Sequence, residues 1–312
     1  MRIGIVGLGS IAHRVYLPLL CGRTDLDVVG LMSRSAATVA RAGSAYRISE
    51  QFTRLDDFLR QAPDLVFVHA PTSAHHEIVT ACLASGASVY VDKPLAYTLA
   101  ECEDLAERAE RAGLLLAVGF NRRFAPMYLR ARDWVSHGGD LIHAAMEKHR
   151  AVAPVQTVRE AVFDDLIHVL DTLVWLLGPQ TGLSAGEAGV DAERGFRLAL
   201  GLVRSPGATG SYAMVRSVGA DTERLTVHAA GRSAEVVDLE HATLDGPEGR
   251  RVVAFGSWDT VIERRGFAGL VQHVLDTADA PMRCDISAAQ VLPTHRLAEA
   301  IVTRARGDVR WS

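Results

Sequence analysis

The chain has 312 residues, of which 48% are hydrophobic and 22% are charged, as in an ordinary globular protein of two domains. Its formal net charge of −4 provides no general basic field, and no apolar run approaches the roughly 18 residues that cross a bilayer. We therefore expect neither a nucleic-acid partner nor a membrane partner. The four cysteines are scattered without a C-x-x-C pair, which argues against a thiolate metal site and predicts reduced thiols in a cytoplasmic protein.

From residue 2 to about residue 121, short apolar runs alternate with amphipathic runs. Strands are expected at 3–6, 28–32, 65–69, 88–91 and 114–118, and helices at 11–20, 36–43, 55–60, 75–85 and 99–112. Pro18 is expected to end or kink the first helix. This alternation predicts an α/β fold, with a doubly wound parallel sheet of the Rossmann type over residues 1–122.

The pattern of apolar residues changes after residue 122. Helices are expected at 124–137, 162–177, 260–279 and 286–305, and strands at 141–150, 196–203, 208–215, 224–230 and 234–239. Because consecutive strands without intervening helices favour antiparallel pairing, residues 123–312 are predicted to form an α+β domain with an open, mostly antiparallel sheet. Its C-terminal helix has the length to pack back on the first domain.

The segment Gly7–Ala12 fits the pattern G-x-G-x-x-A between the first strand and the first helix. Gly7 permits a tight turn, Gly9 lets the backbone approach a pyrophosphate, and Ala12 allows close packing of helix and strand. Ser10 and Ile11 begin the helix, whose free N–H groups favour phosphate. We expect this loop to bind a dinucleotide, with a purely structural glycine turn as the alternative.

The end of the second strand indicates which dinucleotide is bound. An NAD site usually carries Asp or Glu there, whereas this chain has Ser33 and Arg34. Both side chains can bind a 2′-phosphate, Arg34 through charge-assisted hydrogen bonds. We therefore predict NADP in preference to NAD, against the alternative that Arg34 is a solvated surface residue.

Three further motifs carry a family resemblance. They are V-D-K-P-L at Val91–Leu95, G-F-N-R-R-F at Gly119–Phe124 and D-D-L-I-H-V-L-D at Asp164–Asp171. With the glycine loop they resemble the Gfo/Idh/MocA family of oxidoreductases, and more narrowly its bacterial MviM-like branch. The resemblance covers essentially the whole chain. The family's E-K-P motif falls on Asp92-Lys93-Pro94, and its D-x-G-x-H motif falls on Asp164–His168, with Leu166 where glycine is usual.

The resemblance implies hydride transfer between a nicotinamide cofactor and a hydroxyl or keto carbon of a sugar, cyclitol or related small molecule. It also implies a homodimer or homotetramer formed through the open sheet. Besides Asp92 and Lys93, the resemblance places three residues after the fourth strand near the cofactor: Ala70, Pro71 and His75. For His75, a structural role is the alternative.

The predicted chemistry rests on three side chains. Lys93 follows a parallel strand, at the edge where such sheets bind ligands, and can take the proton of an alcohol or return it to a carbonyl. Asp164 and His168 are four residues apart and share one helix face, so both can face a substrate. The alternatives are a surface lysine and a core histidine. Asp165 points away from Asp164 and is the weaker candidate.

Two basic residues are candidates for substrate binding. Arg123 resembles a family arginine that either contacts substrate or pins a loop. Lys148 alternates with its neighbours on a strand, so either Lys148 with Arg150 or Glu147 with His149 faces the cleft. No metal site is expected, because adjacent histidines such as His75 and His76 diverge on a helix and no third ligand follows at a suitable spacing.

Two other functions stay open. One is a cofactor-binding sensor without turnover, in which we would expect Lys93 to be lost. The other is redox-neutral glycoside cleavage with a recycled NAD, which Ser33 and Arg34 disfavour.

Overall fold

Six parallel strands form the sheet of the N-terminal part, in the order β3-β2-β1-β4-β5-β6. They are β1 (Arg2–Val6), β2 (Asp27–Met32), β3 (Gln51–Phe52), β4 (Leu65–Val68), β5 (Ser88–Val91) and β6 (Leu116–Val118). Every residue of β4 and β5 is buried, as expected for strands covered on both faces. The strand order reverses between β1 and β4, which opens a crevice at their carboxyl ends. The predicted doubly wound parallel sheet is confirmed.

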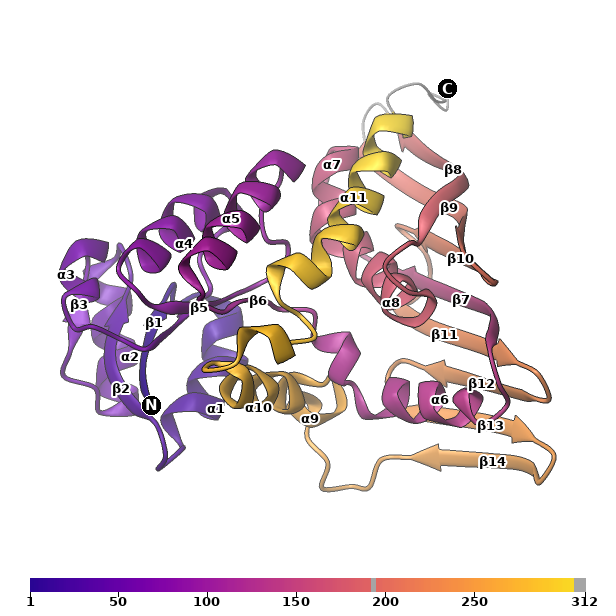
Figure 1. Ribbon diagram of the computed structural model, residues 1–312, viewed down its shortest axis with the longest axis horizontal. Coiled ribbons are helices and arrows are strands. Elements are labelled where there is room, and N and C mark those ends of the chain that lie inside the picture. The colour runs from indigo at the N-terminus through magenta and orange to yellow at the C-terminus, as the bar shows by residue number, and fades with distance from the viewer. Residues whose placement is uncertain (192–194, 306–312) are drawn as a thin grey trace. The chain divides into compact units, whose positions relative to one another are not determined.

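Helices cover both faces of this sheet. They are a π-helical turn (Ala12–Tyr16), α1 (Leu17–Cys21), α2 (Ala36–Tyr46), α3 (Leu55–Leu59), α4 (His75–Ala84), α5 (Leu99–Ala112) and α10 (Phe267–Thr277). Helices α4 and α5 lie along one side of the sheet, and α1 and α10 along the other (Figure 1). Pro18 stands in the first turn of α1, where its missing N–H costs no hydrogen bond, so the helix continues to Cys21.

Eight strands form the second sheet, in the order β14-β13-β12-β11-β7-β10-β9-β8. They are β7 (Leu141–His149), β8 (Gly182–Asp191), β9 (Gly195–Ser205), β10 (Ala208–Val215), β11 (Thr222–Ala229), β12 (Arg232–Val237), β13 (His241–Gly246) and β14 (Gly249–Ala254). Among the described strand pairs of this second sheet, only β7/β10 is parallel. The predicted open, mostly antiparallel sheet is therefore confirmed.

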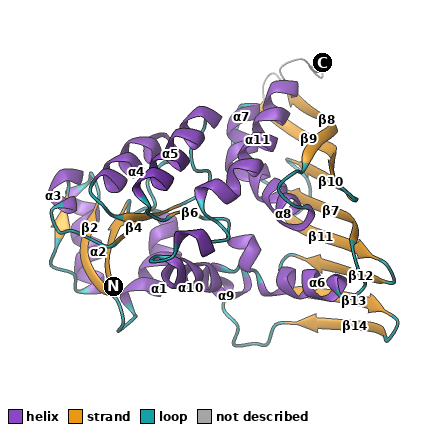
Figure 2. Cartoon of the chain, in the orientation of Figure 1, coloured by secondary structure: helices purple, strands orange, loops and turns teal. Residues whose placement is uncertain are grey.

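Helices lie on one face of the second sheet (Figure 2). They are α6 (Pro126–Ser136), α7 (Val158–Ala161), a π-helical turn (Val162–Leu166), α8 (Ile167–Leu177) and α11 (Ala288–Ala305). The short helix α9 (Val261–Arg264) packs against α6. The other face is open: Leu200 and Leu202 on β9 are 48% and 52% exposed, while Ala199 and Val203 are buried. This alternation is that of a sheet with one covered face.

The structure, a computed structural model, describes residues 1–191 and 195–305. Its contacts group Met1–Phe120 with Leu270–Val291 as a first unit, and Asn121–Gly269 with the chain from Leu292 as a second. The predicted boundary after residue 122 lies two residues beyond this division, and residues 306–312 of the predicted second domain lie outside the described part. No helix in that part is long and apolar enough to cross a membrane.

Two predicted helices are interrupted. The stretch 260–279 breaks at Gly266, whose φ of +79° ends α9 before α10 begins. The stretch 162–177 begins with the π-helical turn Val162–Leu166 and only then becomes α-helical. Both interruptions lie at positions where the apolar periodicity of the sequence gives no sign of them.

Candidate functional site

The two loop glycines have different tasks. Gly7 has a φ of +86°, and a Cβ there would lie 2.5 Å from the backbone N of Ala70 and the backbone C of His69. Only glycine fits this position. A Cβ on Gly9 would instead meet no heavy atom within 4 Å. Open space therefore lies beside the backbone that begins the first helix, which is where the pyrophosphate of a dinucleotide would fit.

Ser10 and Ile11 are exposed at the start of this helix, and Ala12 is fully buried against the sheet. This is the close contact that a small residue at the third position permits. The cradle that the sequence predicts is thus formed by backbone atoms, and its residues fit a bound dinucleotide.

Ser33 and Arg34 connect β2 to α2. The backbone N of Ser33 donates to the carbonyl of Phe52 at 3.1 Å, and the Oγ of Ser35 accepts from the backbone N of Thr38 at 3.3 Å, which caps α2. Arg34 is exposed, and no ion pair or hydrogen bond joins it to the described residues. Its guanidinium therefore has no carboxylate to compete with an anion at this strand end.

His75 is buried beneath the loops that follow β4 and β5. It is 1% exposed, and its Nε2 lies 2.9 Å from the carbonyl O of Ala70 while its Nδ1 lies 3.0 Å from that of Pro94. Burial lowers the pKa of His75 more than the neighbouring carbonyls raise it. The ring therefore lies between the two loops that carry Pro71 and Lys93, and in its neutral form it donates to one of the two carbonyls.

The carboxylate of Asp92 faces the interior of the first unit. Its Oδ2 lies 2.9 Å from Nδ1 of His69, and its Oδ1 accepts from the hydroxyl of Tyr90 at 3.4 Å. Burial raises the pKa of Asp92, but His69, His75 and the Tyr16 hydroxyl outweigh it, so the pKa lies below its usual value. Lys93, the next residue, is half-buried.

His69, Tyr16 and Tyr90 are not among the residues predicted from the sequence. Tyr16 stacks on His69 with ring centroids 4.0 Å apart, and its hydroxyl lies 2.5 Å from that of Tyr90. A histidine directly after the apolar run of β4 was a visible signal, since polar residues at the carboxyl ends of parallel strands are often functional.

Asp164 lies in the π-helical turn of the second unit. Its Oδ2 accepts from Nε2 of Gln156 at 2.9 Å, and Oε1 of Gln156 accepts from the buried guanidinium of Arg216 at 2.6 Å. Because a guanidinium can only donate, Arg216 fixes the orientation of the Gln156 amide toward the carboxylate. His168, four residues further on, is 8% exposed.

Lys148 and Arg150 face the same side of the sheet and contact the same carboxylate. Nζ of Lys148 lies 2.6 Å from Asp165 Oδ1, and Arg150 pairs with both oxygens of that carboxylate at 2.9 Å. Burial and Arg122 lower the pKa of Lys148 to about 8. Asp165, the weaker candidate in the sequence, is thus the centre of a buried charge cluster, and Lys148 is 1% exposed within it.

Arg122 extends this cluster. Its Nη2 lies 2.9 Å from Glu223 Oε2, and the hydroxyl of Tyr128 donates to Oε1 at 3.0 Å. Burial raises the pKa of Glu223, but Arg122 and Lys148 outweigh it and hold the pKa at about 2. Periodicity could not find these partners, because Arg122 and Glu223 are 101 residues apart in the chain.

Arg123 makes a buried two-pronged pair with Asp171. Its Nη2 and Nε lie 2.6 and 2.9 Å from the two carboxylate oxygens, one of which also accepts from the hydroxyl of Thr294. This pair holds the Arg123 side chain against α8 within the second unit.

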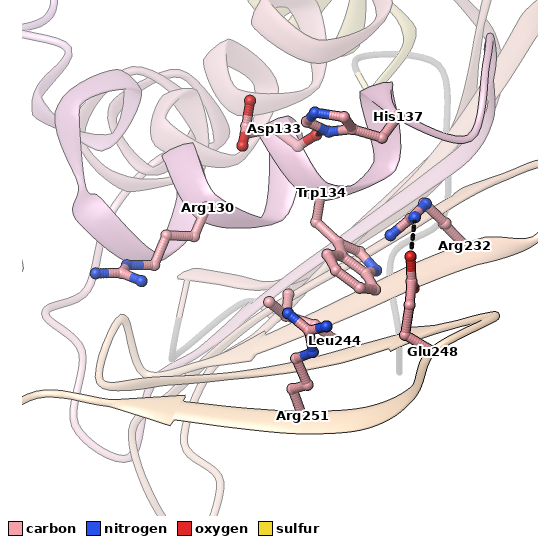
Figure 3. Close-up of a pocket in the computed structure, with 8 residues that line it drawn as sticks. All are labelled: Arg130, Asp133, Trp134, His137, Arg232, Leu244, Glu248 and Arg251. Atoms are coloured by element: carbon pink, nitrogen blue, oxygen red, sulfur yellow. Dashed lines mark hydrogen bonds and ion pairs between the residues drawn. The ribbon is translucent and has the colours of Figure 1, made fainter.

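A surface cavity of about 290 Å³ lies apart from these residues, between α6 and strands β12–β14 (Figure 3). The guanidinium of Arg232 stacks over Trp134 at 4.2 Å and pairs with Glu248 at 2.7 Å. Arg251 lies 5.5 Å from the same ring. The described residues that line this cavity include none of the predicted site residues.

A Rossmann sheet with a glycine loop at the switch point, joined to a second unit built on an open sheet, defines a class of nicotinamide-dependent oxidoreductases. The family model described as "Oxidoreductase family, NAD-binding Rossmann fold" matches residues 1–120. A second family model, described as "YceM-like, C-terminal domain", matches residues 126–246. The chain belongs to the Gfo/Idh/MocA oxidoreductase family, as the resemblance predicted.

Full-length relatives support this membership. YceM of Salmonella typhimurium, which is named provisionally as an oxidoreductase, is 32% identical over 96% of this chain and 97% of its own. Among solved structures, the MviM dehydrogenase of Clostridium difficile superposes with a TM-score of 0.90 at 27% identity, covering 97% of this chain and 99% of its own. A Gfo/Idh/MocA family oxidoreductase of Vibrio cholerae superposes with a TM-score of 0.88 at 29% sequence identity, and the match covers 98% of each chain.

Proposed function

We propose that this protein is an NADP(H)-dependent oxidoreductase that transfers a hydride between the nicotinamide and a hydroxyl or keto carbon of a sugar, cyclitol or related polyol. The family membership supports oxidoreductase chemistry. The sugar class draws support from the D-glucoside 3-dehydrogenase of Escherichia coli, which is 29% identical over 57% of this chain and 54% of its own. An inositol 2-dehydrogenase of Salmonella typhimurium is 25% identical over 57% of this chain and 54% of its own.

The preference for NADP rests on Arg34. Neighbours of this fold hold either cofactor: KijD10 of Actinomadura kijaniata, 19% identical, was solved with NADP, and an Agrobacterium radiobacter oxidoreductase, 16% identical, with NAD+. The fold by itself therefore does not determine which of the two cofactors is bound. An exposed arginine without a carboxylate partner, at the strand end that receives the adenosine ribose, favours a 2′-phosphate.

The bound nicotinamide would accept or supply the hydride. In the oxidative direction, Nζ of Lys93 takes the proton of the reacting hydroxyl as the carbonyl forms, and in reduction it returns that proton to the oxygen. The backbone from Gly7 to Ala12 binds the pyrophosphate. Asp164, held as an acceptor by Gln156, receives hydrogen bonds from substrate hydroxyls, and His168 binds or relays a proton.

We further propose a cytoplasmic homodimer or homotetramer that uses the open face of the eight-stranded sheet. The exposed side chains of Leu200 and Leu202 support this face as the contact. Light scattering of the wild type and of Leu202→Lys tests it: the variant should shift toward the monomer, and an unchanged mass would contradict the proposal.

One variant and one matched control test the preference for NADP. Arg34→Gln removes the charge at the strand end, whereas Arg41→Gln removes an equally exposed charge further along α2. Loss of one charge-assisted contact, about 1.5–3 kcal/mol, should weaken NADPH binding about 10–150-fold in Arg34→Gln. NADH binding and the Arg41→Gln variant should be unchanged. Tighter wild-type binding of NADH than of NADPH would refute the preference.

A screen of sugars, uronates, inositols and keto-sugars, followed by NADPH absorbance in both directions, tests the reaction. On any substrate found, Lys93→Ala should lose about 10²–10⁴-fold in kcat. Unchanged turnover would remove Lys93 from the mechanism. Tight cofactor binding without turnover on any compound would favour a sensor. Glycoside cleavage without net NADPH oxidation would favour the redox-neutral reaction.

A further inference from the structure

One buried polar cluster in the first unit surrounds Asp92, and its other members have no role in the function proposed above. We name His69, Asp92, Tyr16 and Tyr90 the strand-end cluster, because they join the carboxyl ends of β4 and β5 to the helical turn after the glycine loop. The carboxylate of Asp92 accepts from Nδ1–H of His69 at 2.9 Å and from the hydroxyl of Tyr90 at 3.4 Å. The Tyr16 and Tyr90 hydroxyls lie 2.5 Å apart.

The hydrogen bonds of the cluster point in one direction. The pKa of Asp92 is lowered, whereas burial raises the pKa of Tyr16 and of Tyr90 well above the usual value, so the carboxylate is the acceptor and both hydroxyls keep their protons. His69 must then carry a proton on Nδ1. The contacts therefore place a proton on Nδ1 of His69 and leave the Asp92 carboxylate as the acceptor.

His69 is a poor choice if stability alone is required. Its Nε2 is buried and has no hydrogen-bond partner among the described residues. A buried polar atom without a partner lowers stability, and an apolar side chain stacked on Tyr16 would avoid that cost. The cost indicates that the position serves another purpose, which its place in the sheet identifies.

The cluster lies on one side of the switch point. The pyrophosphate loop follows β1, and the ribose that Arg34 would contact lies beyond β2. A dinucleotide that crosses the strand ends must therefore place its other half over the ends of β4 and β5. Those are the two strands that His69 and Asp92 follow, so the cluster lies beneath the predicted place of the nicotinamide.

We propose that the strand-end cluster positions the nicotinamide half of the cofactor. It acts through the backbone, because the side chain of His69 is fully buried. The bond from His69 to Asp92 ties the loop that begins at Ala70 to the loop that begins at Lys93. His69, Asp92, Tyr16 and Tyr90 are thus positioning residues. The proposal rests on the cofactor site proposed above.

Two probes isolate the contribution of the nicotinamide ring. NADPH fluorescence reports binding of the whole molecule, and 2′-phospho-ADP-ribose, added as a competitor, reports binding of everything except that ring. His69→Leu and Asp92→Asn remove the central bond. We expect NADPH to bind about tenfold more weakly to each variant, or about 1.4 kcal/mol, while the affinity for 2′-phospho-ADP-ribose changes less than about twofold.

Three further variants guard against a merely structural effect. In His69→Asn the amide N–H can replace Nδ1–H, so NADPH affinity should recover. Tyr16→Phe removes one hydroxyl beside the Asp92 carboxylate but keeps the bond between His69 and Asp92, so it should give a smaller loss. Thr80→Val, which removes another buried hydroxyl without a hydrogen-bond partner among the described residues, should leave both affinities unchanged. The free energy of unfolding is measured for all variants.

Equal weakening of both probes in His69→Leu and Asp92→Asn, in proportion to lost stability, would show that the cluster only holds the fold. Unchanged NADPH affinity would also overturn the proposal. Wild-type protein that binds NADH in preference to NADPH would instead refute the proposed NADP site, and the same comparison would then use NADH and ADP-ribose. Failure of one proposal is thus distinguishable from failure of the other.

Discussion

Replacing Gly9 with alanine separates binding from folding. A Cβ at this position would meet no heavy atom within 4 Å, and the backbone is not in the left-handed region. The free energy of unfolding should therefore stay the same or rise by about 0.4–1 kcal/mol, because alanine restricts the unfolded chain. In the holoprotein, the same methyl group would occupy the space that a pyrophosphate must enter.

The expected loss of affinity is that of one charge-assisted hydrogen bond to phosphate. That is about 1.5–3 kcal/mol, or about 10–150-fold in the dissociation constant of NADPH. Fluorescence titration measures the affinity, and urea unfolding without cofactor measures the stability. The contrast between the two measurements is the prediction.

Gly7→Ala is the matched control. Its φ of +86° and the backbone of His69 and Ala70, 2.5 Å from the added Cβ, should cost at least about 1–3 kcal/mol of stability before any cofactor is added. If Gly9→Ala bound NADPH normally, the pyrophosphate would not approach this loop. If Gly9→Ala lost as much stability as Gly7→Ala, the space beside Gly9 would not be open.

The buried charge cluster of the second unit yields three more predictions, all measured by urea unfolding. Asp165→Asn leaves Lys148 buried without its 2.6 Å partner and should lower the free energy of unfolding by about 3–5 kcal/mol. Asp221, whose side chain is 61% exposed, is the control, and Asp221→Asn should lower it by about 1 kcal/mol or less. Equal losses in the two variants would contradict the difference in burial. The pKa of Lys148 is about 8 in the folded chain and about 10.4 when unfolded. Between these pH values only the unfolded chain holds the proton, so this group makes stability rise with pH, and Lys148→Met should abolish that rise; an unchanged slope would refute it. The pKa of Glu223 is lowered to about 2, so its contribution to the free energy of unfolding is complete above about pH 4.3 and is lost as the pH falls toward 2. Glu223→Gln should remove this part of the loss of stability at acid pH. The same loss at acid pH in the variant as in the wild type would contradict the prediction.

Local patterns were sufficient where the signal is local. The apolar runs of β4 and β5 and the spacing of Gly7 and Gly9 specify a nucleotide-binding sheet within a few consecutive residues. Such features need only the neighbouring chain, so the sequence predicts them.

Features that depend on distant partners could not be predicted in this way. The alternation of β7 left open which side Lys148 faces, and the answer came from Asp165 in the π-helical turn. Asp165 was ranked below Asp164 because an ideal helix turns them apart. In the structure, Asp165 lies at the centre of the buried charges. Asp164 is oriented by Gln156 and Arg216.

The sequence by itself determined the Rossmann sheet, the glycine loop, the open second sheet and the family, since each is carried by a periodicity or a short motif. The tertiary structure alone decided the surroundings of the site residues. It buried Lys148, paired Arg123 with Asp171 and joined Asp92 to His69. The physical reason is that the free energy of a charged group depends on burial and on the charges within a few ångströms, and most of those partners are distant in the chain.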